Sequence, residues 1–232
     1  MRILAVIPAR GGSKRLPKKN IKLLGGKPLI NWSIEAIRGI SEICEVLVST
    51  DDSEIASIAK QAGASVPWLR PSNLSTDTAS SVDVALHALD WYESKFKSVD
   101  GLLLLQPTSP FRTRKSIENG IDLYLNSNFS SVVAVTPSKD RAALVFTNKD
   151  NFISPFINKS NLFSELSDSV SSYWITGSFY LTSPSILREN KTFLHLQTIP
   201  LIIESPIESI DIDTEWDFQL AKYIAGDIIE EN

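Results

Sequence analysis

The sequence Ile3-Leu-Ala-Val-Ile7 leads through Pro8 and Ala9 into Arg10-Gly-Gly-Ser-Lys-Arg-Leu-Pro-Lys-Lys-Asn-Ile-Lys22. The first five residues have the length and apolar composition of a buried parallel strand. The thirteen residues from Arg10 to Lys22 contain six cations and no acid, although the whole chain has a net charge of −4. A cationic loop with glycines at the carboxyl end of a first strand is suited to bind phosphates. A solvated basic turn is the alternative, and the position after a buried strand favours the phosphate site.

The composition limits the classes of protein to consider. The chain has 232 residues, 43% hydrophobic and 22% charged, which is usual for a globular enzyme with one α/β domain. No apolar run approaches the roughly 18 residues of a membrane span, and the start lacks a signal peptide. The single cysteine, Cys44, excludes an intrachain disulfide and fits the cytoplasm, and two histidines with one cysteine argue against zinc. A mildly acidic chain with one basic loop indicates a local anionic ligand and not a nucleic-acid surface.

Strand-like and helix-like segments alternate through the first 136 residues. Pro28 suits a first helical turn, Ser53 can cap a helix, and Gly63 can end it. This alternation predicts right-handed crossovers and an α/β fold with a doubly wound, mainly parallel sheet. We expect strands over 3–7, 45–50, 101–105 and 131–136, an extended piece over 65–70, and regular structure over 173–181 and 209–213. We expect helices over about 28–40, 53–62, 78–96, 113–125 and 214–224.

Residues 138–172 depart from the alternating pattern. They are rich in Ser, Asn and Lys and contain only short apolar pieces. Because structureless stretches of this length are uncommon in compact domains, we expect a small subdomain or an arm that packs on a partner. A long surface loop is the alternative. The chain is therefore predicted to be a single domain over 1–232 with an excursion at 138–172.

The basic loop matches neither of the common glycine-rich phosphate motifs. A Walker loop needs Gly-Lys-Ser/Thr, whereas Gly26-Lys27 is followed by Pro28, and the dinucleotide pattern G-x-G-x-x-G is absent. What remains is Gly11-Gly12, where the backbone can approach a phosphate closely. The cations Arg10, Lys14 and Lys19 lie beside this pair in the sequence.

Asp211-Ile-Asp213 is a second candidate site. In an extended segment alternate side chains share a face, so the two carboxylates point together while Ile210 and Ile212 point into the core. Two hard oxygen ligands suit Mg²⁺ together with substrate phosphate and water. The alternative is that Asp213 or Thr214 caps the last helix, since Thr214-Glu-Trp-Asp217 resembles a capping box. Capping would account for one aspartate and not for both.

Two polar segments follow expected strands at the edge where α/β proteins bind ligands. Gln106-Pro-Thr-Ser-Pro110 comes directly after the strand 101–105, and Gln106 offers both a donor and an acceptor. The segment from Arg70 to Ser81 contains several hydroxyls that can cap the next helix or line a pocket for a base, with Arg70 facing its acceptors.

Together these motifs resemble the CMP-sialic acid synthetases, also called acylneuraminate cytidylyltransferases, and among them the bacterial legionaminic acid branch. The likeness spans nearly the whole chain and keeps the order of the motifs. It implies a Rossmann-like α/β fold of the nucleotide-diphospho-sugar transferase type, with a small dimerisation lobe that suits 138–172. The matching stretches are Ile7-Pro-Ala-Arg-Gly-Gly-Ser-Lys14, Lys19-Asn20, Leu69-Arg-Pro71, Thr76-Asp-Thr-Ala-Ser-Ser81, Leu105-Gln-Pro-Thr-Ser-Pro110 and Ser209-Ile-Asp-Ile-Asp-Thr-Glu215.

The resemblance also implies a reaction and a set of site residues. The 2-hydroxyl of a nine-carbon 2-keto sugar acid would attack the α-phosphate of CTP, giving the CMP-sugar and pyrophosphate, with Mg²⁺ as cofactor and a homodimer as assembly. The residues implied for CTP are Arg10, Gly11, Ser13, Lys19, Asn20, Arg70 and Ser81. Those implied for the sugar acid are Gln106, Thr108, Ser109 and Tyr173. Those implied for the metal are Asp211 and Asp213, with Arg10 and Lys19 acting beside them in catalysis.

One departure from the family pattern concerns the acceptor. Many sialic acid synthetases carry arginines and an asparagine where this chain reads Glu165-Leu-Ser-Asp-Ser-Val-Ser-Ser172 and Tyr173-Trp-Ile-Thr-Gly-Ser178. Those residues lie near the sugar in the family, so a different acyl pattern, or pseudaminic acid, is an alternative acceptor. A nucleotide-sugar glycosyltransferase and an RNA-binding protein are the other hypotheses. The basic loop near the amino terminus, which suits a triphosphate, disfavours the glycosyltransferase. The lack of a stripe of basic residues disfavours the RNA-binding protein.

Overall fold

The computed structural model describes residues 1–128, 130–138, 146–149, 152–155 and 172–230. Its centre is a six-stranded sheet in the order β10-β6-β9-β5-β1-β4, in which β9 alone runs antiparallel to its neighbours. The predicted α/β fold with a mainly parallel sheet is confirmed. The strands of this sheet are β1 (Ile3–Pro8), β4 (Ile43–Ser49), β5 (Gly101–Leu104), β6 (Val132–Pro137), β9 (Tyr173–Thr182) and β10 (Ile199–Ile202).

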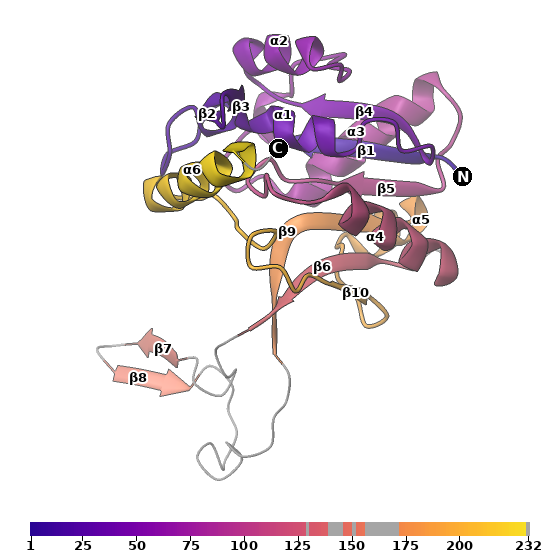
Figure 1. Ribbon diagram of the computed structural model, residues 1–232. Helices are drawn as coiled ribbons and strands as arrows, with labels where there is room; N and C mark the ends of the chain where they lie inside the picture. The colour runs from indigo at the N-terminus through magenta and orange to yellow at the C-terminus, as the bar shows by residue number, and fades with distance from the viewer. Residues whose placement is uncertain (129, 139–145, 150–151, 156–171, 231–232) are drawn as a thin grey trace.

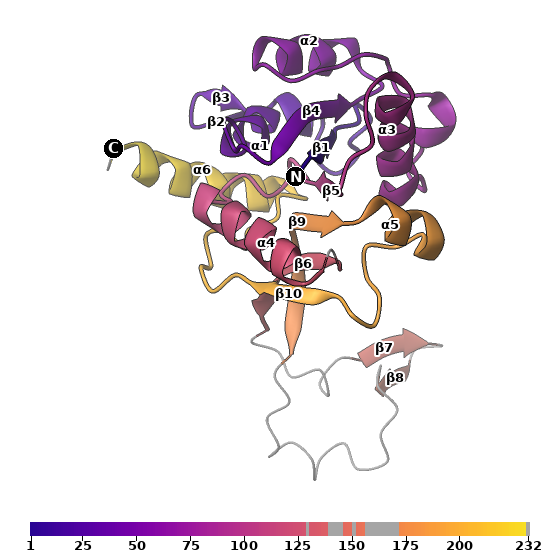
Figure 2. The ribbon, with the colours of Figure 1, turned by 90° about the vertical axis from the view of Figure 1, so that its right-hand side faces the viewer.

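Helices cover both faces of the sheet, as Figure 2 shows with the strands between them. Their bounds are α1 (Leu29–Ala36), α2 (Ser53–Gln61), α3 (Ser81–Lys95), α4 (Arg114–Asn126), α5 (Pro184–Asn190) and α6 (Glu215–Glu230). Two short hairpins, β2 (Leu23–Leu24) with β3 (Lys27–Pro28) and β7 (Phe146–Lys149) with β8 (Phe152–Pro155), and two 3₁₀ turns, η1 (Lys19–Ile21) and η2 (Ser72–Leu74), complete the described elements.

The alternation of side chains along β1 divides the interior into two cores. Ile3, Ala5 and Ile7 point into a cluster shared with α1, α2 and α4. Leu4 and Val6 point to the opposite face, into a cluster shared with α3 and α5. All five are fully buried, because β1 is a central strand covered on both sides.

A third apolar cluster joins the two ends of the chain. It contains Leu16 from the basic loop, Leu24 from β2, Ile212 from between the two aspartates, and Phe218 from α6, with Phe111 beside them. Figure 1 shows α6 lying next to the β2–β3 hairpin. Leu16 and Ile212 are both fully buried, so their burial fixes the charged residues on either side of each.

Several predicted boundaries need correction. The first helix ends at Ala36 and not near Ile40, because Gly39 adopts a positive φ of 72°. The cap of α2 is Asp52 and not Ser53, since the Asp52 carboxylate accepts from Glu54 N and Ile55 N. The segment 65–70 contributes only one bridge, from Ser65 to Leu47, and residues 209–213 form a turn and an irregular segment. The excursion at 138–172 lies mostly outside the described residues.

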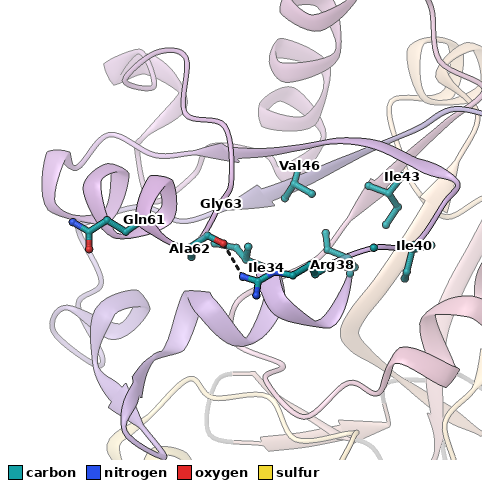
Figure 3. A pocket seen from close by; sticks show the side chains of 10 residues that line it. Ile34, Arg38, Ile40, Ile43, Val46, Gln61, Ala62 and Gly63 are labelled. Atoms are coloured by element: carbon teal, nitrogen blue, oxygen red, sulfur yellow. Dashed lines mark hydrogen bonds between the residues drawn. The ribbon is translucent and has the colours of Figure 1, made fainter.

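The hollow drawn in Figure 3 lies far from the predicted site. It has a volume of about 450 Å³, and Ile34, Ile43 and Val46 are among the residues that line it. Arg38 also lines the hollow, and its Nη2 donates a hydrogen bond to the carbonyl of Ala62 at 3.0 Å. Because Ile43 begins β4, this hollow is at the amino edge of the sheet, opposite the edge where ligands bind in such folds. No helix in the described ranges is long and apolar enough to span a membrane.

Candidate active site

The basic loop and the acidic pair lie in direct contact. Lys19 Nζ is 2.9 Å from Asp213 Oδ1 and donates to the carbonyl of Ile212 at 2.9 Å. Arg15 Nη2 donates to Asp213 Oδ2 at 2.8 Å. The cause is the third cluster, because burying Leu16 with Ile212 brings their charged neighbours together. Two segments separated by 194 residues therefore form one charged site.

The 3₁₀ turn η1 shapes the end of the basic loop. Lys18 enters it in the left-handed region, at a φ of 54°, and Lys19 then turns inward with 13% of its side chain exposed. The buried Asn20 donates from Nδ2 to the carbonyl of Arg10 at 2.9 Å and so ties the two ends of the loop together. In this arrangement the Asn20 amide supports the backbone of the loop, next to the site implied for the nucleotide.

Asp211 is held at the base of the loop that follows β5. The amide of Ile212 donates to the carbonyl of Thr108 at 2.7 Å, and the Thr108 side chain donates to the Asp211 carboxylate. Burial raises the pKa of Asp211 above its ordinary value, and the charge of Asp213 raises it further. The residue still has a solvent-exposed surface. Asp211 is thus surrounded by protein on several sides yet open to a ligand on another.

The pKa of Asp213 is shifted in the opposite direction from that of Asp211. Burial opposes its ionisation, but the hydrogen bond and charge of Lys19 and the charge of Arg15 outweigh this and lower its pKa. The carboxylate does not cap α6. Asp217 Oδ2 accepts from Asp213 N at 3.0 Å and Thr214 N at 2.7 Å, so Asp217 and Thr214 fill the capping roles. The capping alternative for Asp213 is therefore wrong.

The acidic pair fits a hard divalent cation. The described ranges contain no group of three or more His, Cys, Asp or Glu that could hold a metal, so Asp211 and Asp213 would need other ligands. Mg²⁺ is commonly bound by one or two carboxylates with substrate phosphates and water. Burial is the main reason that the pKa of Asp211 is raised, and the charge of Asp213 adds to it; a cation between the two acids would relieve this repulsion.

The part of the basic loop around Gly11 lies beside the end of β4. Gly11 N donates to Asp51 Oδ1 at 2.9 Å, and a Cβ added at Gly11 would lie 2.6 Å from Asp52 Oδ2. Only glycine therefore fits at position 11. Ser13 continues the turn, with its amide donating to the Gly11 carbonyl at 2.9 Å.

Arg70 also packs against the end of β4, and it is buried. Its Nε donates to Ser49 Oγ at 3.0 Å, Nη2 donates to the Ser49 carbonyl, and Nη1 donates to the carbonyl of Leu74 at 3.4 Å. Burial lowers the pKa of Arg70 to about 10. The guanidinium is thus occupied by protein acceptors, in contrast to the expected open arrangement. Ser81 is exposed at the first position of α3.

The segment after β5 is fixed against β9. Ser109 is fully buried and donates to the carbonyl of Thr176 at 2.9 Å. A Cβ added at Gly177 would lie 2.5 Å from Gln106 Oε1, so Gly177 permits the close approach of Gln106. Tyr173 is exposed and lies four residues before Gly177, opposite Pro137. At about 3.3 Å per residue this places Tyr173 roughly 13 Å along the strand from Gly177.

Arg112 is a site residue that the sequence did not reveal. Its side chain is buried, and it donates from Nε to the Ser178 carbonyl at 2.9 Å, from Nη1 to Ser33 Oγ at 2.5 Å, and from Nη2 to the Gln106 carbonyl. Burial lowers the pKa of Arg112 to about 9, opposed by the charge of Asp211. Its neutral acceptors come from three separate segments. The one local signal was a charged residue directly after Phe111, at the end of the segment that follows β5.

Comparison with known proteins places this site in a family. A family model described as cytidylyltransferase matches residues 4–154. The chain belongs to the cytidylyltransferase family. It is 41% identical over 227 residues to the CMP-N,N'-diacetyllegionaminic acid synthase of Legionella pneumophila, covering 96% of this chain and 95% of that protein. It is 33% identical over 222 residues to the N-acylneuraminate cytidylyltransferase of Escherichia coli, covering 95% of this chain and 51% of that protein.

The fold of this cytidylyltransferase recurs in a solved structure. That structure is CMP:2-keto-3-deoxy-manno-octonic acid synthetase in complex with CTP, with a TM-score of 0.69, 19% identity and complete coverage of both chains. At this identity the likeness concerns the fold alone. The family resemblance seen in the motifs is thus confirmed, and the chain is a nucleotidyltransferase.

Gly177 gives a direct test of how this cytidylyltransferase positions Gln106. Gly177→Ala places a methyl group against Gln106 and forces alanine to a φ of 72°, so we expect the free energy of unfolding to fall by about 1–2 kcal/mol. Because Gln106 must move, we expect kcat/KM to fall about 10–100-fold, measured by pyrophosphate release. The control is Gly226→Ala on α6, where an added Cβ meets nothing within 4 Å. Unchanged kcat/KM in Gly177→Ala would show that activity does not depend on this position of Gln106.

Proposed function

We propose that the enzyme transfers the cytidylyl group of CTP to a nine-carbon 2-keto sugar acid of the legionaminic type. The main support for this proposal is the contact between Lys19 and Asp213. It brings the basic loop, which is suited to bind phosphates, next to two carboxylates that are suited to bind a divalent metal ion. Similarity to the Legionella pneumophila synthase along 96% of the chain supports the choice of acceptor. Membership of the cytidylyltransferase family favours this function over the glycosyltransferase and RNA-binding hypotheses.

The chain's own groups would act mainly by positioning and by neutralising charge. Such transfers need in-line placement of the reactants and stabilisation of charge more than covalent chemistry from the protein. Lys19 and Arg10 would bind the β- and γ-phosphates, where negative charge grows as pyrophosphate leaves. The backbone at Gly11 and the Ser13 hydroxyl would bind beside them. Asn20 would hold the loop closed around the nucleotide, through its bond to the Arg10 carbonyl.

In the proposed reaction the 2-hydroxyl oxygen bonds to the α-phosphorus, and the bond from that phosphorus to the oxygen shared with the β-phosphate breaks. Pyrophosphate departs and the hydroxyl proton is released, which balances the reaction. Asp211 and Asp213 would hold Mg²⁺, which supplies Lewis-acid stabilisation to the phosphate oxygens when bound. Arg70 and Ser81 would lie on the cytosine side of the site.

The sugar acid would bind at the segment that follows β5. Gln106 offers an amide to its hydroxyl groups, and Thr108 and Ser109 shape the backbone below it. Tyr173 would reach the sugar from further along β9. We propose one domain over 1–232, in which the excursion at 138–172 makes a homodimer contact, and a cytoplasmic place of action.

The acceptor is tested with a panel of sugar acids. The full chain is incubated with CTP, Mg²⁺ and N,N'-diacetyllegionaminic, pseudaminic or N-acetylneuraminic acid, and pyrophosphate is measured. We expect the highest kcat/KM with the legionaminic acid and no release after chelation of the metal by EDTA. A preference for one of the other two acids would replace the proposed acceptor. Absence of pyrophosphate with all three would overturn the function.

A further inference from the structure

Every cation of the basic loop is paired with a carboxylate. Four different acids supply the partners, and two of them, Asp77 and Asp213, each bind two cations. Asp213 belongs to the proposed metal site, whereas Asp77 has no part in the proposed function. The pairs are Arg10–Asp77, Lys14–Asp77, Arg15–Asp213, Lys18–Glu54, Lys19–Asp213 and Lys22–Glu215.

Asp77 presents its two oxygens to two different cations. Oδ1 is 2.6 Å from Arg10 Nη1, and Oδ2 is 2.5 Å from Lys14 Nζ. Hydrogen bonding from Lys14 and then from Arg10 lowers the pKa of Asp77, so it is ionised at neutral pH. Two anionic oxygens bound in this way resemble the non-bridging oxygens of a phosphate group.

The exposure of this cluster argues against a structural role. The side chains of Arg10, Asp77 and Lys14 are 35%, 45% and 80% exposed. Ion pairs this open to solvent contribute little to the stability of a fold. Asp77 lies between η2 and the cap of α3 at Ser80, in a segment without regular structure, so it can separate from the loop without breaking a helix or strand.

We propose that Asp77 is an exchangeable counter-ion that occupies the phosphate-binding cations until a polyphosphate displaces it. The inference rests on the proposed function, in which Arg10 binds phosphate. A polyphosphate can bind only after both ion pairs of Asp77 have broken. Because only the unpaired fraction of the enzyme can bind, the apparent affinity for the polyphosphate is lower than it would be without Asp77. The same cost applies to the pyrophosphate product. Asp77 therefore weakens product binding and favours release.

The test compares pyrophosphate binding in two charge-matched variants of the full chain. Asp77→Asn removes the charge of the counter-ion. Glu54→Gln removes the charge of a different carboxylate, which lies 2.8 Å from Lys18 Nζ of the same loop. We expect Asp77→Asn to bind pyrophosphate about 3–10-fold more tightly by calorimetry, an effect that shrinks as salt is raised. We expect Glu54→Gln to change the affinity less than about twofold. A merely structural role of Asp77 would predict weaker binding.

A double-mutant cycle identifies the residues through which Asp77 acts. In a Lys14→Met background, Asp77→Asn should gain less affinity than in the wild type, because one of its two pairs is already absent. Equal or weaker pyrophosphate binding by Asp77→Asn, in an enzyme that still turns over CTP, would overturn the role of Asp77 alone. An equal gain in Glu54→Gln would also overturn it, as a general effect of charge. Absence of pyrophosphate binding in both the wild type and Asp77→Asn would overturn the counter-ion proposal, whereas the proposed function fails only if no sugar acid gives pyrophosphate release from CTP.

Discussion

Asp211→Asn is expected to lower kcat about 10²–10³-fold while leaving the melting temperature at or above that of the wild type. If Asp211 holds Mg²⁺ as proposed, its loss removes several kcal/mol of transition-state stabilisation, and each 1.36 kcal/mol is worth about tenfold in rate. The stability should not fall, because burial raises the pKa of Asp211. With the folded-state pKa above the unfolded one, the ionised carboxylate opposes folding at neutral pH, and an amide removes that opposition.

Pyrophosphate release and thermal unfolding of the same preparations measure the two effects. Asp122→Asn, at an exposed position on α4, is the matched control and should alter neither quantity. Wild-type kcat in Asp211→Asn at saturating Mg²⁺ would remove Asp211 from the metal ligands. A large drop in melting temperature would show instead that the Asp211 carboxylate supports the fold.

Arg112→Met should lower the free energy of unfolding by about 3–5 kcal/mol, as expected when one partner of a buried charged network is removed. The change leaves the carbonyls of Gln106 and Ser178 and the hydroxyl of Ser33 without their donor. Because the Gln106 carbonyl is among them, activity should fall too. Urea unfolding gives the stability, and the slope of its transition should be unchanged if the native state remains compact.

Arg114→Met is the control for this second variant. Arg114 also makes three hydrogen bonds, to Glu118 and to the carbonyls of Arg38 and Gly39, but it is exposed. We expect its replacement to cost less than about 1 kcal/mol, because water can replace the lost donors. Similar losses in both variants would mean that burial does not set the importance of Arg112.

The sequence predicted those elements whose signals are local. The continuous apolar run Gly101–Leu104 and the capped helices are visible in the composition and the period of the sequence. The helix Pro184–Asn190 was missed because it has only seven residues, and the strand Ile199–Ile202 was missed because Pro200 interrupts its short apolar run. The second of them becomes a strand by pairing with β6, which no local pattern records. The sequence also placed the cap of α2 one residue too late, at Ser53 instead of Asp52, because both side chains can cap a helix.

The parts of the candidate site that form short sequence motifs could be predicted. The basic loop and the acidic pair are visible in the sequence, and the structure brings Lys19 to Asp213. The partners of Arg112 were not predictable, because Ser33 and Ser178 lie 79 and 66 residues away from it. The ion pairs of Asp77 were missed for the same reason, since Arg10 is 67 residues distant. Pairings of this kind are set by the fold and not by the neighbouring residues.

The union of Leu16 with Ile212 has a consequence for the order in which the molecule acquires its properties. A contact between residues so far apart in the sequence requires a long loop to close, and such contacts tend to form after local ones. The sheet can assemble around β1 and β5 from nearer partners before this junction closes. Catalytic competence is then a late acquisition, and a compact chain with most of its secondary structure can still lack it.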